Sequence, residues 1–109
     1  MKKSDSEFLD IIGAVVDVAS EVIRMYEDED FESIPDAAYS GEQLAESLSQ
    51  FPVDNEDATG FEGLFDDIKY GFRGVKLSAK ESDMDKLGDS IDQLGRDVSD
   101  LEDLSRGIA

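Results

Sequence analysis

The last quarter of the chain carries a seven-residue repeat of apolar side chains, and this repeat constrains the fold more than any other feature. Two series recur seven positions apart: Met84, Ile91 and Val98, and Leu87, Leu94, Leu101 and Ile108. Apolar residues at alternating steps of three and four share one face of an α-helix, whereas a strand would need a period of two. The repeat therefore predicts a long helix over residues 82–107, with Ser82 as its N-terminal cap.

The apolar seam of this helix has two uses that the sequence leaves open. Its candidate contact residues are Leu87, Ile91, Leu94, Val98 and Leu101. Packing in a helical bundle would bury them within the chain, whereas pairing through residues 84–108 would give a homodimeric coiled coil. Gly88 and Gly95 lie beside the seam, where a second helix could approach closely. We therefore expect either a monomer or a homodimer formed by this seam.

Three earlier segments also show the apolar spacing of a helix. They cover residues 5–27, 41–51 and 61–75, and each has apolar side chains three and four positions apart. No alternation typical of a strand competes with them. The sequence therefore predicts a single all-α domain over residues 1–109, built as a small bundle of about four helices.

Turn and cap residues suggest where these helices begin and end. Consecutive acids at 27–30 would oppose the dipole of the first helix at its C-terminus, so the helix should end there, and Pro35 marks a break. Ser40 and Gln43 form a capping-box pattern for a helix that starts at residue 41. Residues 52–60 read as a loop.

The third helix is the least regular of the four. It contains Gly63, Gly71 and Gly74, each of which costs about 1 kcal/mol relative to Ala in a helix interior. A helix that ends near Gly71, followed by an extended segment through Leu77, is therefore the alternative to a continuous helix.

Charge is distributed very unevenly along the chain. The net charge is −18, and residues 25–68 hold fourteen of the 28 acids without one Lys or Arg. A small soluble domain usually carries a net charge of magnitude about 2–8. Such a strong negative field repels nucleic acid, nucleotides and anionic membranes, and it attracts basic surfaces. The expected partner is therefore a basic protein, with no direct binding of nucleic acid or membrane.

A stripe of cations follows the acid-only segment. Lys69, Arg73, Lys76 and Lys80 are spaced four, three and four residues apart, which places them on one face of a continuous helix. A phosphate site here would be overwhelmed by the net charge. We expect the stripe to dock on the acid-only segment as an internal counter-charge.

The residue types exclude most catalytic chemistry. The chain has no Cys and no His, so it lacks a thiolate, the commonest general base and the commonest metal ligand. Asp83 and Asp85 begin like a calcium-binding loop, but Leu87 and Leu94 occupy positions that need oxygen ligands. We therefore predict a protein that is not an enzyme, with no cofactor and no metal site.

The sequence also favours a cytoplasmic location. No apolar run approaches the roughly 18 residues that a membrane span needs. Acids follow Lys2 and Lys3 before any apolar run, which is atypical of a signal peptide.

The candidate partner-binding surface consists of clustered acids in residues 25–68 and acids on the outer face of the last helix. Spread evenly over the roughly 6,000 Å² expected for a protein of this mass, the acids would reach about half the charge density of B-DNA. Clustering raises that density locally. The candidate residues are Glu27, Asp28, Glu29, Asp30, Glu32, Asp36, Asp54, Glu56, Asp57, Asp66, Asp67, Asp89, Asp92, Asp100 and Asp103.

Three functions fit these observations. In charge and size the chain resembles the small acidic helical proteins that phages encode against restriction and CRISPR enzymes, which implies a DNA mimic acting in the host cytoplasm against a basic nucleic-acid-binding protein. The alternative is an acidic helical adaptor, secretion chaperone or toxin-neutralising partner that acts through the apolar seam. A whole-surface adaptation to high salt is the third, but adaptation should spread the charge rather than cluster it.

Overall fold

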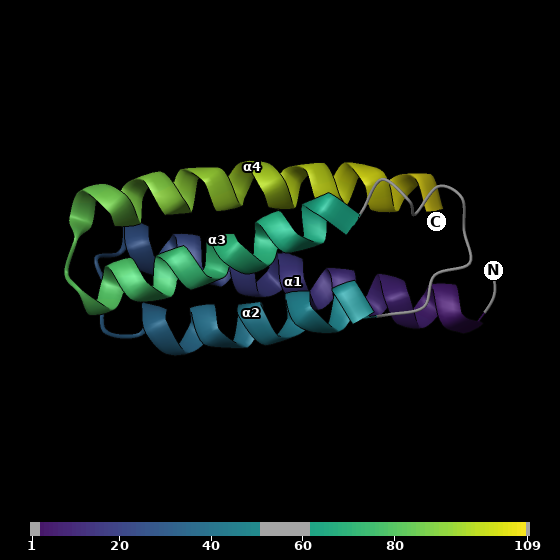
Figure 1. Ribbon diagram of the computed structural model, residues 1–109, viewed down its shortest axis with the longest axis horizontal. Coiled ribbons are helices and arrows are strands. Elements are labelled where there is room, and N and C mark those ends of the chain that lie inside the picture. Colours follow the sequence, from purple (N-terminus) through teal and green to yellow (C-terminus); the bar gives the residue numbers. More distant parts are fainter. Residues whose placement is uncertain (1–2, 51–61, 109) are drawn as a thin grey trace.

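The computed structural model describes residues 3–50 and 62–108, and within them the chain forms four helices that run alternately up and down (Figure 1). The helices are α1 (Lys3–Glu27), α2 (Ile34–Gln50), α3 (Glu62–Lys80) and α4 (Met84–Ile108). The predicted all-α bundle is confirmed. The predicted loop at 52–60 lies outside the described residues.

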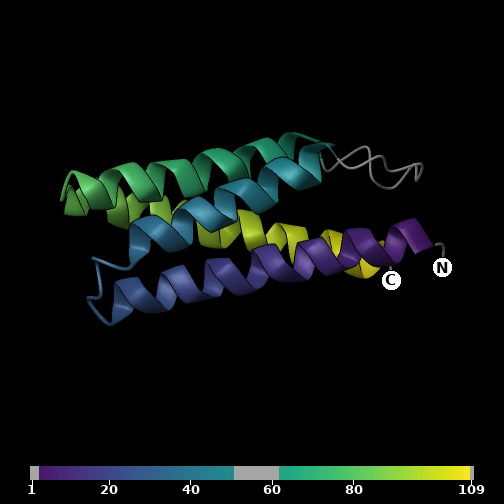
Figure 2. The same cartoon turned by 90° about the horizontal axis from the view of Figure 1, so that it is seen from below.

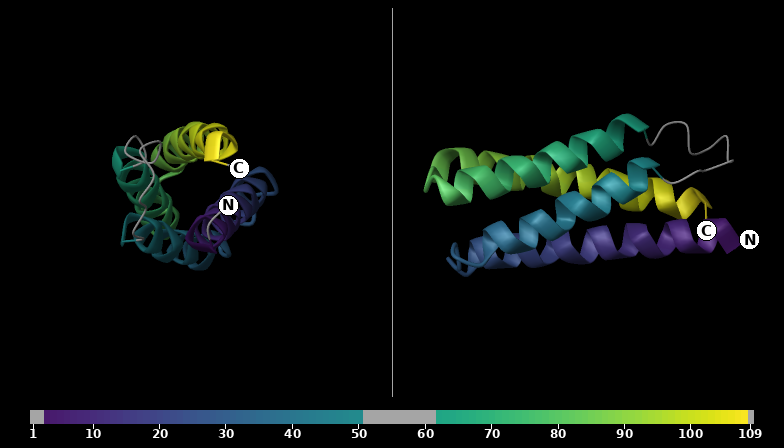
Figure 3. Two further views of the ribbon diagram at one scale, coloured as in Figure 1. Left: turned by 90° about the vertical axis from the view of Figure 1, so that its right-hand side faces the viewer. Right: turned by 60° about the horizontal axis from the view of Figure 1, so that its bottom comes forward.

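The helices form a closed square in which each one packs against two neighbours (Figure 3). Contacts join α1 to α2, α2 to α3, α3 to α4 and α4 back to α1. The molecule is a rod with extents of 43 × 20 × 19 Å. Figure 2 shows that α1 begins and α4 ends at the same end of this rod.

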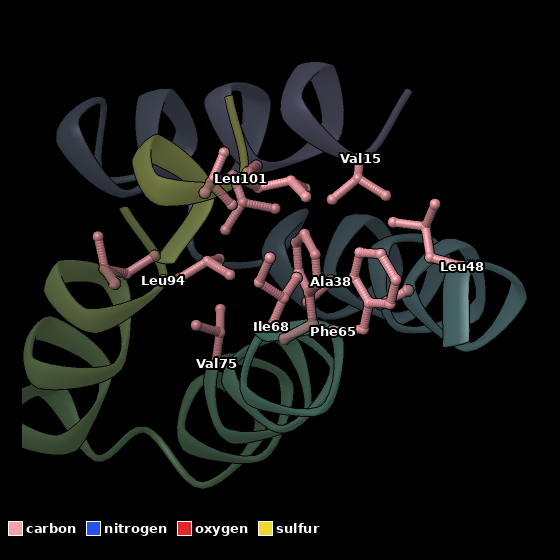
Figure 4. Close-up of a cluster of buried hydrophobic side chains, with 14 of the residues drawn as sticks. Val15, Ala38, Leu48, Phe65, Ile68, Val75, Leu94 and Leu101 are labelled. Atoms are coloured by element: carbon pink, nitrogen blue, oxygen red, sulfur yellow. The ribbon is translucent and has the colours of Figure 1, made fainter. Parts of the chain in front are cut away.

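The core follows from one apolar stripe on each helix. Side chains from all four helices, among them Val15, Ala38, Ile68 and Leu94, point into a shared interior (Figure 4). Phe8 and Phe65 meet edge to face across it, with ring centroids 5.8 Å apart. Burial of apolar side chains on four amphipathic faces is therefore what holds these helices together.

The apolar seam of α4 is used inside the bundle. Its five candidate residues, Leu87, Ile91, Leu94, Val98 and Leu101, are at most 5% exposed. Among the repeat residues from 84 to 101, Met84 alone is exposed. Packing within the chain therefore accounts for the seven-residue spacing, and the seam offers no surface to a second copy while the bundle is closed.

Helix α2 begins seven residues earlier than the capping pattern predicts. It starts at Ile34, and the carbonyl of Ser33 accepts a hydrogen bond from the amide of Ala37 at 3.4 Å. Pro35 is compatible with this position because the first helical turn needs no amide donor. Ser40 is not a cap, since its hydroxyl donates to the Asp36 carbonyl inside the helix at 3.3 Å.

Helix α3 is continuous despite its glycines, so the interrupted alternative is wrong. A side chain at Gly71 would lie 3.3 Å from Leu94 Cδ1, and one at Gly74 would lie 3.2 Å from Ser90 Oγ. These two glycines therefore face α4 at close range. The close packing against α4 is possible only because glycine has no side chain, and this packing offsets the low helix propensity of the two glycines.

Helix α1 ends at Glu27, where the run of acids predicts its end. The amide of Asp30 donates to the Met25 carbonyl at 2.8 Å, and the amide of Glu29 donates to the Tyr26 carbonyl at 3.2 Å. This pair of bonds forms a Schellman motif, which places one residue in the left-handed region. That residue is Glu29, with φ of 61°.

The same motif ends α3. The amide of Asp83 donates to the Ser78 carbonyl at 3.0 Å, and the amide of Ser82 donates to the Ala79 carbonyl at 3.2 Å. Ser82 has φ of 58°, so it belongs to the end of α3 and does not cap α4. The cap is Asp83, whose Oδ1 accepts a hydrogen bond from the Lys86 amide at 3.2 Å.

We expect Glu29→Gly and Ser82→Gly each to raise the free energy of unfolding by about 1 kcal/mol, because glycine adopts the left-handed conformation without steric cost. Urea denaturation would measure the change. Glu32→Gly is the control: it also removes one acid from the same link, but Glu32 does not have a positive φ. The expectation is contradicted if Glu32→Gly stabilises the protein as much as Glu29→Gly.

Candidate acidic interaction surface

Every described acid of the predicted surface is exposed. These residues are Glu27, Asp28, Glu29, Asp30, Glu32, Asp36, Asp66, Asp67, Asp89, Asp92, Asp100 and Asp103. The remaining three predicted acids, Asp54, Glu56 and Asp57, lie outside the described residues. The fold places residues 27–32 at one end of the rod, and it places Asp67, Asp92 and Asp100 along grooves on either side of α4.

The α1–α2 link and the α3–α4 link lie at the same end of the rod (Figure 1), and this link end is strongly acidic. Residues 27–36 and 80–86 hold nine acids and two lysines. Within residues 3–50 and 62–108, none of the acids at 27–32 forms an ion pair, and Asp30 accepts only the Ser33 hydroxyl at 3.0 Å. Sequence analysis missed Glu81, Asp83 and Asp85 as members of this cluster, because only the antiparallel fold brings the two links to the same end.

Acids of α4 line a groove against α1. Its volume is about 520 Å³, and Glu27, Asp92 and Asp100 lie along it with one cation, Arg96. Both glycines of the seam face this side of α1: a Cβ at Gly88 would lie 3.0 Å from Tyr26 Oη, and one at Gly95 3.7 Å from Ile23 Cδ1. The helix that approaches the two glycines is therefore α1 of the same chain.

A second groove, of about 400 Å³, separates α3 from α4. Its lining residues are Asp67, Tyr70, Gly71, Ser90, Gln93 and Asp97. Asp97 is not among the predicted surface acids, although it lines this groove. Its position immediately before Val98 is the one signal that it faces the neighbouring helix.

Asp97 carries a buried charge without a cation to balance it. The residue is 8% exposed, and its Oδ1 accepts a hydrogen bond from Gln93 Nε2 at 3.1 Å. Burial raises the pKa of Asp97, the Gln93 hydrogen bond opposes that rise, and the charges of Asp67 and Asp100 add to it. At neutral pH the ionised carboxylate therefore destabilises the folded state, and protonation as the pH falls towards the raised pKa relieves that cost.

The basic stripe of α3 docks on α2, as its spacing predicts. Arg73 Nη2 and Lys76 Nζ each lie 2.8 Å from a carboxylate oxygen of Glu42, and Lys69 pairs with Glu46. Glu42 and Glu46 belong to the acid-only segment, so the stripe offsets two of its charges. Lys80, the fourth cation, forms no ion pair within the described part of the chain.

These pairs shift two pKa values. Burial alone would raise the pKa of Glu42, which is 6% exposed, but hydrogen bonds from Lys76 and Arg73 outweigh it and the pKa is lowered. The hydrogen bond to Glu46 raises the pKa of Lys69. Glu42 and Lys69 are therefore both held in their charged forms at neutral pH.

The ion pairs leave the face formed by α2 and α3 nearly balanced in charge. Two exposed tyrosines extend this face, with Lys76 Nζ 5.2 Å from the Tyr39 ring centroid and Arg73 Cζ 5.5 Å from that of Tyr70. Among the described residues, acids without an ion pair remain at the link end of the rod, along α4 and along α1. The α2–α3 face is therefore the compensated side of the bundle, and the other faces form its acidic side.

Across residues 3–50 and 62–108, no group of three or more acids is placed to hold a metal ion. None of the helices in those ranges has a stretch long and apolar enough to cross a membrane.

Comparisons with protein-family models, with curated proteins and with solved structures found no match to this chain.

Proposed function

We propose that the protein is a non-enzymatic inhibitor that imitates nucleic acid and binds in the basic groove of a nucleic-acid-binding protein. The observation that carries the proposal is an elongated bundle, 43 Å long, whose link end holds nine acids and two lysines. A cytoplasmic role of the anti-restriction or anti-CRISPR type would supply such a partner.

The density of charge along the rod supports this proposal. A net charge of −18 on a rod 43 Å long is about one charge per 2.4 Å of axis. Duplex DNA carries one per about 1.7 Å. A groove built to hold a duplex would therefore meet roughly 70% of the duplex's charge per unit length.

The uneven distribution of charge makes one side of the rod more attractive to a basic partner than the other. Because Lys69, Arg73 and Lys76 neutralise acids of α2, the α2–α3 face attracts a basic partner less than the link end and α4 do. Electrostatic steering would orient the rod with its acidic side towards the groove. An adaptor that acts through the seam is not favoured, because the seam residues are buried in the chain's own core and cannot contact a partner.

Replacing Glu27, Asp28, Glu29 and Asp30 with Lys should weaken partner binding by about 100-fold or more, because several ion pairs of the interface are reversed at once. The partner would first be captured from a lysate of the source cell and eluted with a salt gradient, with duplex DNA as competitor. Elution at moderate salt and displacement by DNA are the expected results, since exposed ion pairs are screened.

A matched control variant distinguishes the effect of positions 27–30 from the effect of the net charge. Glu7, Asp10, Asp17 and Glu21 are exposed acids of α1 outside the proposed surface, and their replacement by Lys changes the net charge by the same amount. We expect this control to weaken binding less than tenfold. Equal losses of affinity in the two variants would show that the effect arises from net charge alone. Undiminished binding by the variant with Lys at positions 27–30 would overturn the proposal.

A further inference from the structure

The outer face of α3 carries a regular stripe of side chains that points away from the core. Its members recur at steps of four, three, four and three residues, and all of them are exposed: Asp66, Tyr70, Arg73, Leu77 and Lys80. This spacing places them along one side of the helix, as in the seam of a helix pair. Tyr70 is 59% exposed and Leu77 is 47% exposed, so the stripe presents apolar surface to solvent.

Charge distinguishes this face from the rest of the surface. Helices α2 and α3 together hold six acids and four cations, whereas α1 and α4 hold thirteen acids and five cations. Two copies of a chain with a net charge of −18 repel each other most strongly where acids lack counter-charges. The α2–α3 face is therefore the side on which a second copy can approach at the lowest electrostatic cost.

The stripe is complementary to itself when its direction is reversed. In an antiparallel pair of α3 helices with a twofold axis between residues 73 and 74, Tyr70 lies opposite Leu77 of the second copy. Asp66 then lies within one position of Lys80 of the second copy. Within the described part of the chain, neither Asp66 nor Lys80 forms an ion pair. A twofold interface requires such reciprocal contacts, and the sequence of the stripe supplies them.

The centre of this arrangement holds a cation whose charge is already balanced. Arg73 lies closest to the twofold axis, and its Nη2 is 2.8 Å from a carboxylate oxygen of Glu42 in the same chain. Its Cζ also lies 5.5 Å from the Tyr70 ring centroid. Tyrosine and arginine are enriched among the residues that carry most of the binding energy of interfaces. The middle of the stripe therefore has the composition of an interface centre.

The area of the face is sufficient for a weak dimer. Helix α3 has 19 residues, which corresponds to a length of about 28 Å. With α2 beside it, the face spans the 20 Å width of the rod. Covering it would bury roughly 570 Å² on each copy, or about 1,100 Å² in total, which is near the lower limit of about 1,000 Å² for a specific interface.

We propose that two copies of this protein form an antiparallel dimer through the outer face of α3, with Tyr70 of each copy packed against Leu77 of the other. The inference goes beyond the proposed function and does not depend on it. Helix α1 lies diagonally across the bundle from α3. The dimer therefore leaves the acids of the α1–α4 groove free for a basic partner.

Analytical ultracentrifugation of the full chain, over concentrations from about 1 µM to about 1 mM, measures the association. We expect a monomer–dimer equilibrium with a dissociation constant in the micromolar range, and tighter dimerisation at about 0.5 M salt than at about 0.15 M. Salt screens the repulsion between two acidic chains, whereas it weakens the binding of a basic partner. A chain that stays monomeric at the highest concentration and the higher salt would overturn the inference without affecting the proposed inhibitor.

Two substitutions locate the interface. Leu77→Asp should weaken dimerisation about tenfold or more, because it places a charge against the Tyr70 ring of the other copy. Met84→Asp is the matched control: Met84 is 40% exposed, lies outside the stripe and receives the same added charge. We expect it to change dimerisation less than about twofold. Both side chains are exposed, so the fold is retained, and equal effects of the two variants would contradict an interface on α3.

Crosslinking tests the antiparallel register, because the chain has no cysteine of its own. A mixture of Asp66→Cys and Lys80→Cys chains should form covalent dimers with a short bis-maleimide. Each variant alone should not, since identical positions lie roughly 20 Å apart along antiparallel helices. Crosslinking of either variant alone as readily as the mixture would show a different arrangement and overturn the proposed dimer.

Discussion

Gly41→Ala should lower the free energy of unfolding by about 2 kcal/mol, although alanine is the better helix former. Gly41 is buried in α2 against the ring of Phe72 in α3. A Cβ at this position would lie 2.5 Å from Phe72 Cζ, 2.6 Å from Cδ1 and closer still to Cε1. Phe72 is 0% exposed, so its ring is enclosed by the core and its neighbours must shift if it moves. Overpacking of about 1–3 kcal/mol or more therefore outweighs the gain of up to about 1 kcal/mol in helix propensity.

Gly13→Ala is the matched control for this effect. Gly13 also lies inside a helix, but a Cβ there would meet nothing within 4 Å. The same substitution should therefore stabilise the protein by about 0.5–1 kcal/mol. Urea denaturation of both variants gives the difference.

A double-mutant cycle assigns the cost to the contact. In a Phe72→Leu background the ring is gone, so Gly41→Ala should lose most of its destabilising effect. An unchanged cost in that background would show that the ring is not responsible. Stabilisation of similar size by Gly41→Ala and Gly13→Ala would contradict the close packing of α2 on α3.

The sequence was sufficient to predict the four helices because the apolar stripe of each helix is regular. The seven-residue repeat of α4 corresponds directly to five buried seam residues. Helix boundaries were less certain where two signals competed. Ser40 and Gln43 satisfy a local capping rule, but Ile34 and Ala38 bury completely and extend the apolar stripe of α2 back to Pro35. Burial in the core outweighed the local preference.

Charge posed a different problem, because the fold decides which acids are compensated. The spacing of Lys69, Arg73 and Lys76 indicated a counter-charge, but it did not reveal that Glu42 receives two cations. For Asp97, the one sequence signal that separates it from the exposed acids of α4 is its position immediately before Val98. Because the sequence contains 28 acids, some pairs between acids and cations are expected in any fold. Which acids pair with which cations depends on how the helices pack.

The acidic end of the rod arises in the same way. Glu27 and Asp83 are far apart in the chain, yet the antiparallel fold brings both links to one end (Figure 1). The acids at 27–32 are exposed, and they are only part of the acidic end of the rod. The local charge is larger than the sequence segment alone suggests.

Glu42→Gln should destabilise the protein by about 2–3 kcal/mol at pH 7, because it leaves two cations of α3 beside a neutral amide. Breaking a buried ion pair by removing one partner costs about 3–5 kcal/mol. The value here is lower because the Arg73 side chain is 45% exposed and water screens part of its charge. Glu46→Gln, one helical turn later, should cost less than about 1 kcal/mol, since the Glu46 side chain is 38% exposed.

The pH dependence of this cost tests its cause. Hydrogen bonds from Lys76 and Arg73 hold the pKa of Glu42 below its ordinary value of 4.5, against the effect of burial. A carboxylate with a lowered pKa in the folded state stabilises fully above the unfolded value, and this stabilisation is lost as the pH falls through the folded value. The difference in unfolding free energy between wild type and Glu42→Gln should therefore be constant above about pH 5 and shrink below pH 4.5.

Taking the difference between the two proteins is essential in so acidic a chain. Protonation of the exposed acids relieves self-repulsion as the pH falls, and Asp97, whose pKa burial raises, also gains stability on protonation. Both effects oppose the loss at Glu42, but they are shared by wild type and variant and cancel in the difference. A difference that stays constant down to pH 3, or one below about 0.5 kcal/mol at pH 7, would show that the Glu42 cluster does not hold α3 on α2 and that apolar packing alone joins these helices.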